Sequence, residues 1–208
     1  MVPVTEPWRI RPLGPDDSIE ELTDLLHRGY AGLAERGLRY LASHQDVSTT
    51  RSRTAAGDCF VAEDPATGAL LGTIVVHPPG ARHGRTAPDE PAWYRRDDVA
   101  VFAQYCVDPR MAGRGLGRAL HATAEAHARA LGARELACDT AAEATDLIAM
   151  YRRWGYRIVD AADWDVTNYR SVVLSKTLDA PSDHGSATAE APAPLRASDA
   201  RPSEAPPS

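Results

Sequence analysis

A glycine-rich turn between a strand and a helix is the first stretch of this sequence that could do chemistry. The residues from Val99 to Val107 are β-favouring or small, and Pro109 cannot donate to a sheet ladder, so a buried strand should end before it. The helix that follows starts within the turn, and its free N–H groups and positive dipole end make an anion site that suits a diphosphate. Three glycines let a ligand approach the backbone closely: Gly113, Gly115 and Gly117.

Two common phosphate loops do not fit this turn. The P-loop of nucleotide hydrolases needs Gly-Lys followed by Ser or Thr, but Gly117 is followed by Arg118 and Ala119. The dinucleotide fingerprint G-x-G-x-x-G, started at Gly113, needs a glycine at position 118. A simple alternative is that the glycines only let the strand and the helix pack closely.

The run from Val107 to Gly117 resembles the pyrophosphate loop of the GNAT acetyltransferase superfamily, roughly V-x-P-x-x-[R/Q]-G-x-G-[I/L]-[G/A]. One position departs from it, because Ala112 stands where the family usually has Arg or Gln. The resemblance implies that the loop binds acetyl-CoA, largely through backbone N–H groups, and Arg110, Arg114 and Arg118 are candidates to supply positive charge. The cofactor-binding residues expected from it are Cys106, Val107, Ala112, Gly113, Arg114, Gly115, Leu116, Gly117, Arg118 and Ala119.

A second stretch is similar to the family's other signature, N-x-x-A-x-x-L-Y-x-x-x-G-[F/Y]. Tyr151, Gly155 and Tyr156 fall in register with it, whereas Ala144 replaces Asn and Met150 replaces Leu. The resemblance implies that Tyr151 is the catalytic general acid that protonates the departing CoA thiolate. A phenol has a reference pKa near 10, so it keeps its proton at neutral pH. The alternative is an aromatic core residue at a helix end.

The family also implies direct attack of a neutral amine on the thioester carbonyl. A backbone N–H at the end of the central strand, from Cys106 or Val107, is then expected to stabilise the charge on the carbonyl oxygen. An acetyl-cysteine at Cys106 is not expected, because the family generally transfers directly and the sequence indicates no histidine neighbour.

The general base stays open at this point. Many relatives use a glutamate on the central strand, but the nearest polar side chain here is Gln104, which cannot act as a base. Asp139, at the end of the next strand, is the first candidate, and Glu63 is a distant second. Both also fit as ordinary cap or surface carboxylates.

The elements that position these residues follow from hydrophobic periodicity and turn signals. They predict the order β-α-α-β-β-β-α-β-α-β-β, which also resembles the GNAT fold over about Trp8 to Leu178. That fold is a mixed, mostly antiparallel α/β sheet of about seven strands with about four helices, and acyl-CoA lies where its fourth and fifth strands splay apart. The expected strands are 8–13, 59–63, 70–76, 99–107, 135–140, 156–159 and 171–178; the expected helices begin near 19, 46, 116 and 142.

Three further segments carry expectations of their own. The stretch from His77 to Asp98 reads as a long loop whose Trp93 and Tyr94 could form a wall of a substrate pocket, or as a surface insertion. His127 is expected to be a packed or edge histidine. Residues 179–208 are rich in Pro, Ala and Ser and are predicted to be a disordered tail after an acetyltransferase domain at 1–178.

The composition excludes several classes of protein. With a net charge of -6 and a pI near 5.6, the chain is not expected to bind nucleic acid. No apolar run is long enough to span a membrane, and Met1 to Arg9 contain no apolar signal region. The cysteines at 59, 106 and 138 are odd in number and far apart, which indicates a reduced, cytoplasmic setting. The seven histidines have no ligand spacing, so no metal is expected.

Together these observations predict an N-acetyltransferase that moves acetyl from acetyl-CoA directly to a primary amine, most simply of a small molecule. Two alternatives remain: acetylation of a protein N-terminus or lysine, and a non-catalytic module that senses acyl-CoA. Acetyl and longer acyl donors both fit the motifs, and a homodimer is one expectation because the family often dimerises.

Overall fold

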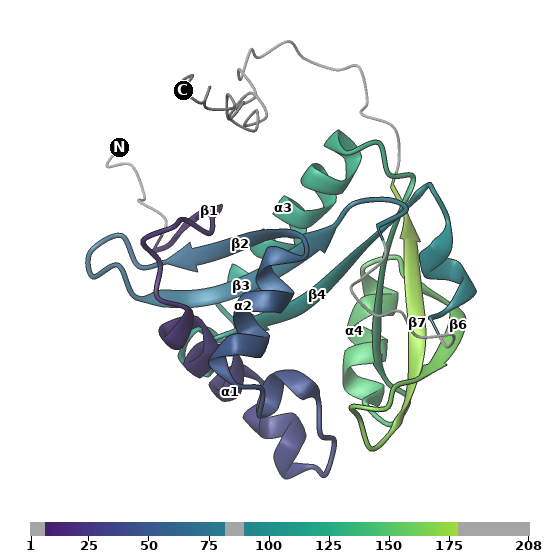
Figure 1. Cartoon of the computed structure of the whole chain (residues 1–208), viewed down its shortest axis with the longest axis horizontal. Helices are drawn as coiled ribbons and strands as arrows, with labels where there is room; N and C mark the ends of the chain where they lie inside the picture. The colour runs from purple at the N-terminus through teal and green to yellow at the C-terminus, as the bar shows by residue number, and fades with distance from the viewer. Residues whose placement is uncertain (1–6, 82–89, 179–208) are drawn as a thin grey trace, which may run out of the picture.

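The computed structural model describes residues 7–81 and 90–178, so the predicted tail and part of the predicted long loop lie outside the described residues. The described part is a mixed α/β fold around one sheet (Figure 1). Its strands are β1 (Arg9–Pro12), β2 (Asp58–Glu63), β3 (Leu70–His77), β4 (Val99–Val107), β5 (Glu135–Ala141), β6 (Arg157–Asp163) and β7 (Arg170–Thr177). The helices are α1 (Ile19–Glu35), α2 (Val47–Ala55), α3 (Leu116–Ala130) and α4 (Thr145–Arg153), with 3₁₀ turns η1 (Leu41–Ser43), η2 (Ala92–Arg95) and η3 (Pro109–Met111).

The sheet has seven strands in the order β1-β2-β3-β4-β5-β7-β6, and β4 and β5 are the parallel pair among antiparallel neighbours. This confirms the predicted mixed, mostly antiparallel sheet. β4 and β5 pair only through residues 99–101 and 135–137, although both strands continue well beyond them. The predicted splay between the fourth and fifth strands is therefore present.

A backbone irregularity marks the place where β4 leaves its neighbour. Gln104 has φ of 49°, and it is the one non-glycine residue with positive φ in the described part of the chain. The β3–β4 register shifts at the same place, between Thr73 and Val75. An extra residue of this kind bends a strand and changes the direction of its side chains, and such bulges are common next to active sites.

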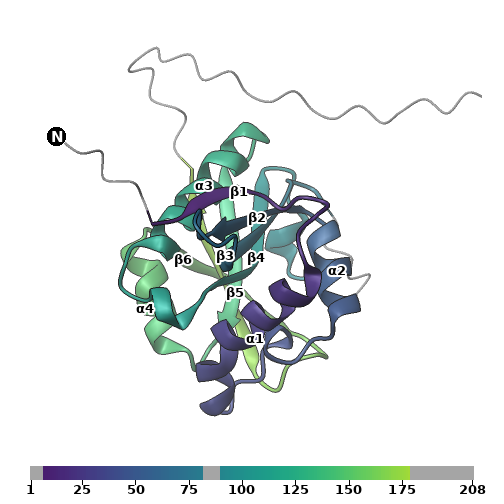
Figure 2. The same ribbon diagram turned by 90° about the vertical axis from the view of Figure 1, so that its left-hand side faces the viewer.

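Helices cover both faces of the sheet (Figures 1 and 2). Successive residues of β3 point to opposite faces, so Val75 packs with α1 while Ile74 and Val76 pack with α3. Because helices bury both faces, β3 is buried along its whole length. The α1 face is built from Leu22, Leu25, Leu26, Val61, Leu70 and Cys106, and the α3–α4 face from Phe102, Leu116, Leu120, Leu136, Ile148 and Tyr151.

The first two helices begin where side-chain caps satisfy their free N–H groups. Ser18 Oγ accepts from the N–H of Glu21 at 3.0 Å, as the capping-box pattern predicts. Asp46 caps α2 by accepting from the N–H of Thr49 at 2.7 Å. α4 begins later than expected, because Ala144 closes a turn onto Ala141 O at 3.0 Å.

Two classes of feature are missing from the described residues. Across 7–81 and 90–178, no helix is both long and apolar enough to cross a membrane. The same part of the chain gathers no group of three or more side chains that could hold a metal ion.

α1 crosses β4 so closely that Gly29 has no room for a side chain. A Cβ atom added there would lie 2.7 Å from Cys106 Cβ and 3.0 Å from Cys106 Sγ. Gly32, in the same helix, has no atom within 4 Å of the equivalent position.

These two glycines make a matched pair for a stability measurement. Gly29→Ala is expected to lower the free energy of unfolding by about 1–3 kcal/mol, because the new methyl group overpacks the contact with Cys106. Gly32→Ala is expected to raise it by up to about 1 kcal/mol, because alanine is the better helix former. Urea unfolding followed by circular dichroism measures both. Equal effects of the two substitutions would contradict this packing.

Candidate functional site

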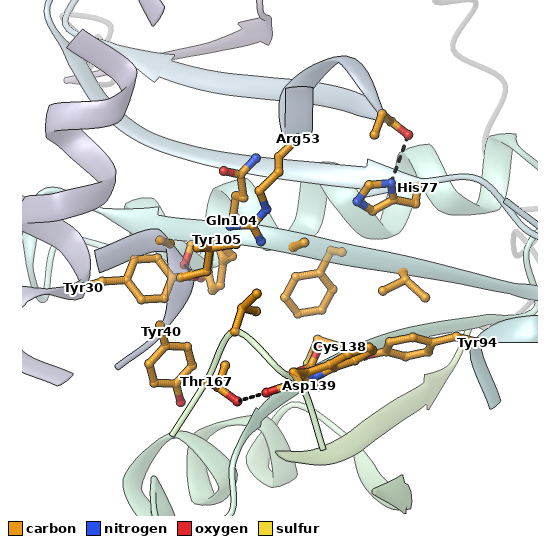
Figure 3. Close-up of a pocket in the computed structure, with 18 of the residues that line it drawn as sticks. Tyr30, Tyr40, Arg53, His77, Tyr94, Gln104, Tyr105, Cys138, Asp139 and Thr167 are labelled. Atoms are coloured by element: carbon orange, nitrogen blue, oxygen red, sulfur yellow. Dashed lines mark hydrogen bonds between the residues drawn. The ribbon is translucent and has the colours of Figure 1, made fainter. Parts of the chain in front are cut away.

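A cavity of about 330 Å³ lies in the opening between β4 and β5 (Figure 3). β4 contributes residues beyond its paired part, and β5 contributes Cys138 and Asp139. The outer walls come from α1, the α1–α2 connection, α2 and the loop between β6 and β7. Its lining residues include Tyr30, Tyr40, Arg53, His77, Glu90, Tyr94, Phe102, Gln104, Tyr105, Tyr151, Trp164, Thr167 and Tyr169.

Trp93 and Tyr94, in the long loop before β4, were both candidates for a pocket wall, and one of them lines the cavity. Tyr94 lines the cavity and is buried. Trp93 is not among the lining residues, and its ring packs under the guanidinium of Arg96 at 4.2 Å. Tyr94 is therefore the aromatic residue of this loop that can meet a ligand.

Asp139 lies in the cavity with both carboxylate oxygens held. The Tyr94 hydroxyl donates to Oδ1 at 3.1 Å, and Trp164 Nε1 donates to Oδ2 at 2.8 Å. These two donors fix the orientation of the carboxylate without adding a positive charge beside it. Asp139 can therefore still interact with a cation or a proton brought by a ligand.

The second candidate base, Glu63, lies elsewhere. It sits on β2 and does not line the cavity. Arg11 Nε donates to its Oε2 at 2.6 Å, and Arg9 holds the other oxygen. Hydrogen bonds from Arg11, and then from Arg9, lower the pKa of this carboxyl. Glu63 is therefore a paired carboxylate of the sheet edge, and its position outside the cavity favours Asp139 as the candidate base.

Tyr151 lies near the end of α4, with its ring in the core and at the wall of the cavity. The ring packs against Phe102 and Tyr156, with centroid separations of 6.0 and 5.5 Å. Burial raises the pKa of Tyr151 well above 10, so the phenol stays protonated at neutral pH.

The turn after β4 is held by a buried carboxylate. Asp108 accepts from the N–H of Arg110 at 3.0 Å and from its guanidinium at 2.8 Å, and Arg28 approaches from α1. The bonds from Arg110 lower the pKa of Asp108 to about 2. Arg110 is thus engaged by Asp108 within the turn.

The other two arginines of the turn differ from Arg110. The Arg118 guanidinium lies over the Trp154 ring, 5.1 Å from its centroid. Arg114 is exposed on the turn. These two residues therefore remain as sources of positive charge near the start of α3.

The N–H groups of the turn fall into two sets. Those of Ala112, Arg114 and Ala119 are occupied, by Pro109 O, Met111 O and Gly115 O respectively. Gly113 and Gly115 have φ of 74° and 90°, which a glycine adopts without strain. Gly115 is the N-cap of α3 and provides no side-chain cap, so Leu116, Gly117 and Arg118 begin the helix with N–H groups that lack intrahelical partners.

Cys106 turns its thiol away from the cavity. The Sγ atom lies 3.9 Å from Leu25 O under α1, and Cys106 does not line the cavity. Burial raises the pKa of this thiol to about 12, so it is a packed side chain and not a nucleophile.

Backbone alternation separates the two predicted oxyanion donors. The N–H of Asp108 bonds Leu71 O on β3 at 2.8 Å. Since successive N–H groups of a strand point to opposite sides, the N–H of Val107 points away from β3, towards the opening, and that of Cys106 points towards β3. Val107 is thus the better placed donor.

Tyr105 connects the turn to the cavity. Its ring lines the cavity, and its hydroxyl donates to Gly117 O at 2.7 Å. Tyr105 therefore joins the wall of the cavity to the first turn of α3.

A buried histidine cluster lies behind this site and was missed from sequence. His121 Nε2 lies 2.8 Å from the Tyr156 hydroxyl, and its Nδ1 lies 3.4 Å from Glu125, which also binds Lys176 at 2.5 Å. Burial lowers the pKa of His121 to about 4. The available signal was its place beside the apolar stripe of α3, four residues before Glu125. His127, by contrast, is an edge histidine as expected, 2.8 Å from Asp58.

Comparisons with known proteins agree with this arrangement. The family model described as Acetyltransferase (GNAT) family matches residues 19–156. A comparison of the sequence with curated proteins found no match. Among solved structures, a GNAT family acetyltransferase from Elizabethkingia anophelis with acetyl-CoA bound aligns with TM-score 0.57 at 15% identity, covering 84% of this chain and 100% of that one.

Two other solved structures give the same result for the fold. The ribosomal-protein-S18-alanine N-acetyltransferase from Escherichia coli aligns with TM-score 0.59 at 15% identity, over 86% of this chain and 99% of that one. An acetyltransferase from Streptococcus agalactiae aligns with TM-score 0.59 at 19% identity, over 84% and 100%.

The histidine cluster predicts a pH dependence of stability. The pKa of His121 is lowered in the folded protein, so between about pH 6.5 and 4 the unfolded chain binds a proton that the folded chain does not. Stability should therefore fall as pH falls through this window, and His77, whose pKa burial also lowers, adds to the same trend. His121→Gln should remove on the order of 2 kcal/mol of the difference in unfolding free energy between pH 7.5 and 5.

Urea unfolding at the two pH values measures this difference. The matched control is His44→Gln, because His44 is exposed and its substitution should leave the pH dependence unchanged. An unchanged pH dependence in His121→Gln would show that the buried imidazole does not couple to folding.

Proposed function

Because the chain belongs to the acetyltransferase (GNAT) family, we propose that it transfers acetyl from acetyl-CoA directly to the primary amine of a small molecule. The observation that carries this proposal is the place of Tyr105, which lines the cavity and donates a hydrogen bond to the first turn of α3. A diphosphate bound at the helix start and a thioester in the opening would then lie in one path. An acyl donor and an amine acceptor can meet there.

The first part of the path holds the CoA diphosphate. The N–H groups of Leu116, Gly117 and Arg118 face it, and the dipole of the 15-residue helix adds positive potential. Gly113 and Gly115 keep the backbone open, since no atom lies within 4 Å of the place where either Cβ would be. Ala112 and Ala119, whose N–H groups are occupied, contribute only through the shape of the loop, while Arg114 adds the positive charge of its side chain. The pantetheine arm follows the opening towards Phe102.

The transfer of the acetyl group takes place beyond the diphosphate site, in the cavity. The amine nitrogen attacks the thioester carbon, and Asp139 accepts the proton that the amine loses, directly or through water. The N–H of Val107 stabilises the carbonyl oxygen as it gains negative charge. When the carbon–sulfur bond breaks, Tyr151 donates its phenolic proton to the leaving thiolate. The phenol carries its proton at neutral pH, as a general acid must.

A closed wall favours a small acceptor over a protein. Asn168, between β6 and β7, accepts from the N–H of Arg39 and donates to Gly37 O, both at 2.9 Å. The rings of Tyr40 and Tyr169 pack beside these bonds, with centroids 4.8 Å apart. The α1–α2 connection is thus joined to the β6–β7 loop across the place where an extended peptide would need an open groove.

A non-catalytic acyl-CoA sensor is the second candidate. It would share the donor site but would not need Asp139 oriented in the cavity by two donors. Turnover distinguishes the two functions, since a sensor binds acetyl-CoA and releases no thiol with any amine.

Calorimetric titration with acetyl-CoA tests the donor site. Gly115→Glu places a carboxylate at the start of α3 and should weaken binding by at least about tenfold, through repulsion of the diphosphate. Gly132→Glu is the matched control. That glycine also has positive φ, 84°, and no atom within 4 Å of its Cβ position, but it follows the far end of α3. Absence of binding to the unaltered protein would contradict the proposed function itself.

Tyr151→Phe tests the general acid. Release of free thiol should slow by about 10²–10⁴-fold in kcat, the usual contribution of a positioned acid, while the Kd for acetyl-CoA changes little. Tyr156→Phe is the control, because this neighbouring buried tyrosine bonds His121 and not the cavity. A Tyr151→Phe variant that turns over as fast as the unaltered enzyme would eliminate the phenol as the acid.

A further inference from the structure

The cavity contains a polar group that the protein itself leaves unsatisfied. Gln104 is 3% exposed and lines the cavity, yet its amide Nε2 has no hydrogen-bond partner in the described structure. Buried donors are almost always paired, because an unpaired N–H loses its hydration without compensation. A ligand with a hydrogen-bond acceptor would satisfy this group.

A chain of hydrogen bonds fixes which end of the Gln104 amide is the unpaired NH2 group. Arg53 Nη1 lies 2.5 Å from Gln45 Oε1, and a guanidinium can only donate, so this atom of Gln45 must be the oxygen. The other end of Gln45 is then the NH2 group, which donates to Thr50 Oγ1 and Gln104 Oε1, both at 2.8 Å. Gln104 Oε1 must accept the bond from this NH2 group. The NH2 group of Gln104 therefore lies at the other end of its amide, directed away from Gln45.

The backbone of Gln104 is also unusual. Its φ of 49° is sparsely populated for a non-glycine residue, and it occurs at the bulge where β4 leaves β5. Conformations of this kind persist where the surroundings impose them, often at ligand sites. The strand and the amide chain therefore both fix the side chain in the wall of the cavity.

Opposite charges lie on opposite sides of the cavity. Figure 3 shows Arg53 and Gln104 on one side and Asp139 with Tyr94 on the other. The first side offers a positive charge and an unsatisfied NH2 donor. The second offers a carboxylate oriented by Tyr94 and Trp164. An acceptor complementary to both sides carries an anionic group and an amine.

We propose that the acceptor is a free amino acid or a close analogue, whose carboxylate accepts from Gln104 Nε2 beside Arg53 while its amine lies towards Asp139. This rests on the proposed acetyl transfer and specifies its substrate class. The volume of about 330 Å³ suits a molecule of this size. Gln104 is then a specificity residue: it donates to the substrate carboxylate and takes no part in proton transfer.

Matched acceptors test the proposal. Steady-state rates of thiol release are compared for the common amino acids, for their carboxamides and for the amines that lack the carboxylate. The best amino acid should exceed its own carboxamide and amine in kcat/KM by about tenfold to a hundredfold, the usual range for a hydrogen bond to a charged group. Equal or faster acetylation of the carboxamides or amines would overturn the proposal and leave the acetyltransferase function intact. Loss of acetyl-CoA binding, by contrast, would overturn that function.

Two variants test whether Gln104 and Arg53 cause the preference for an acceptor with a carboxylate. Gln104→Glu keeps the size of the side chain but replaces the donor with a carboxylate, so the ratio of kcat/KM between amino acid and carboxamide should collapse towards one. Arg53→Met should reduce the same ratio, because it removes the charge and releases the amide chain. Arg51→Met, an exposed arginine of α2 outside the cavity, is the control and should keep the ratio.

The ratio is measured within one preparation, so partial misfolding of a variant cannot change it. A ratio that stays the same in Gln104→Glu would show that this amide does not contact the carboxylate.

Discussion

The early parting of β4 and β5 is the constraint on which the rest of the structure depends. Two strands that separate leave buried N–H and C=O groups without a ladder, and such groups need other partners. Tyrosine hydroxyls replace some of the missing strand partners. The Tyr30 hydroxyl donates to Tyr105 O at 3.2 Å, and the Tyr40 hydroxyl accepts from the N–H of Ala141 at 2.9 Å. Both tyrosines come from the α1 region, so this region stabilises the open form of the sheet while it forms a wall of the cavity.

The same parting explains why donor and acceptor chemistry can share one site. The end of β4 leads into the turn held by Asp108 and then into α3, while its bulge directs Gln104 into the cavity. β5 brings Asp139 to the opposite side, and α4 brings Tyr151 to the wall. None of these positions needs a long or flexible connection, because Gln104, Asp139 and Tyr151 lie within β4, β5 and α4, and the turn follows directly from β4.

Most of the fold could be predicted from the sequence, because its signals are local. Alternation, capping residues and glycine stops placed the seven strands and four helices, and the two motifs indicated the turn and Tyr151. The site was harder to predict wherever a partner is distant in the chain. Asp139 and Glu63 were both carboxylates on strands, and only their partners, Tyr94 and Trp164 or Arg9 and Arg11, separate their roles.

Gln104 is another residue whose role could be predicted only in part, because its orientation depends on distant partners. Its type excluded it as a base, which was visible in sequence. Its orientation depends on Gln45, which is 59 residues away, and through Gln45 on Arg53. Arg110 was one of three candidate sources of positive charge. Asp108, two residues before it, engages its guanidinium, and sequence spacing alone does not show this pairing.

The origin of the cavity walls has a consequence for how such an enzyme can diversify. The turn and helix start at 107–119 and Tyr151 are separate in sequence from α2, the α1–α2 connection and the β6–β7 loop, which form the outer walls. Substitutions in the walls can therefore alter which molecule is admitted without disturbing the part that handles the thioester. The two parts can therefore evolve separately: a lineage can keep the residues that handle the thioester and acquire new acceptors through substitutions in the outer walls.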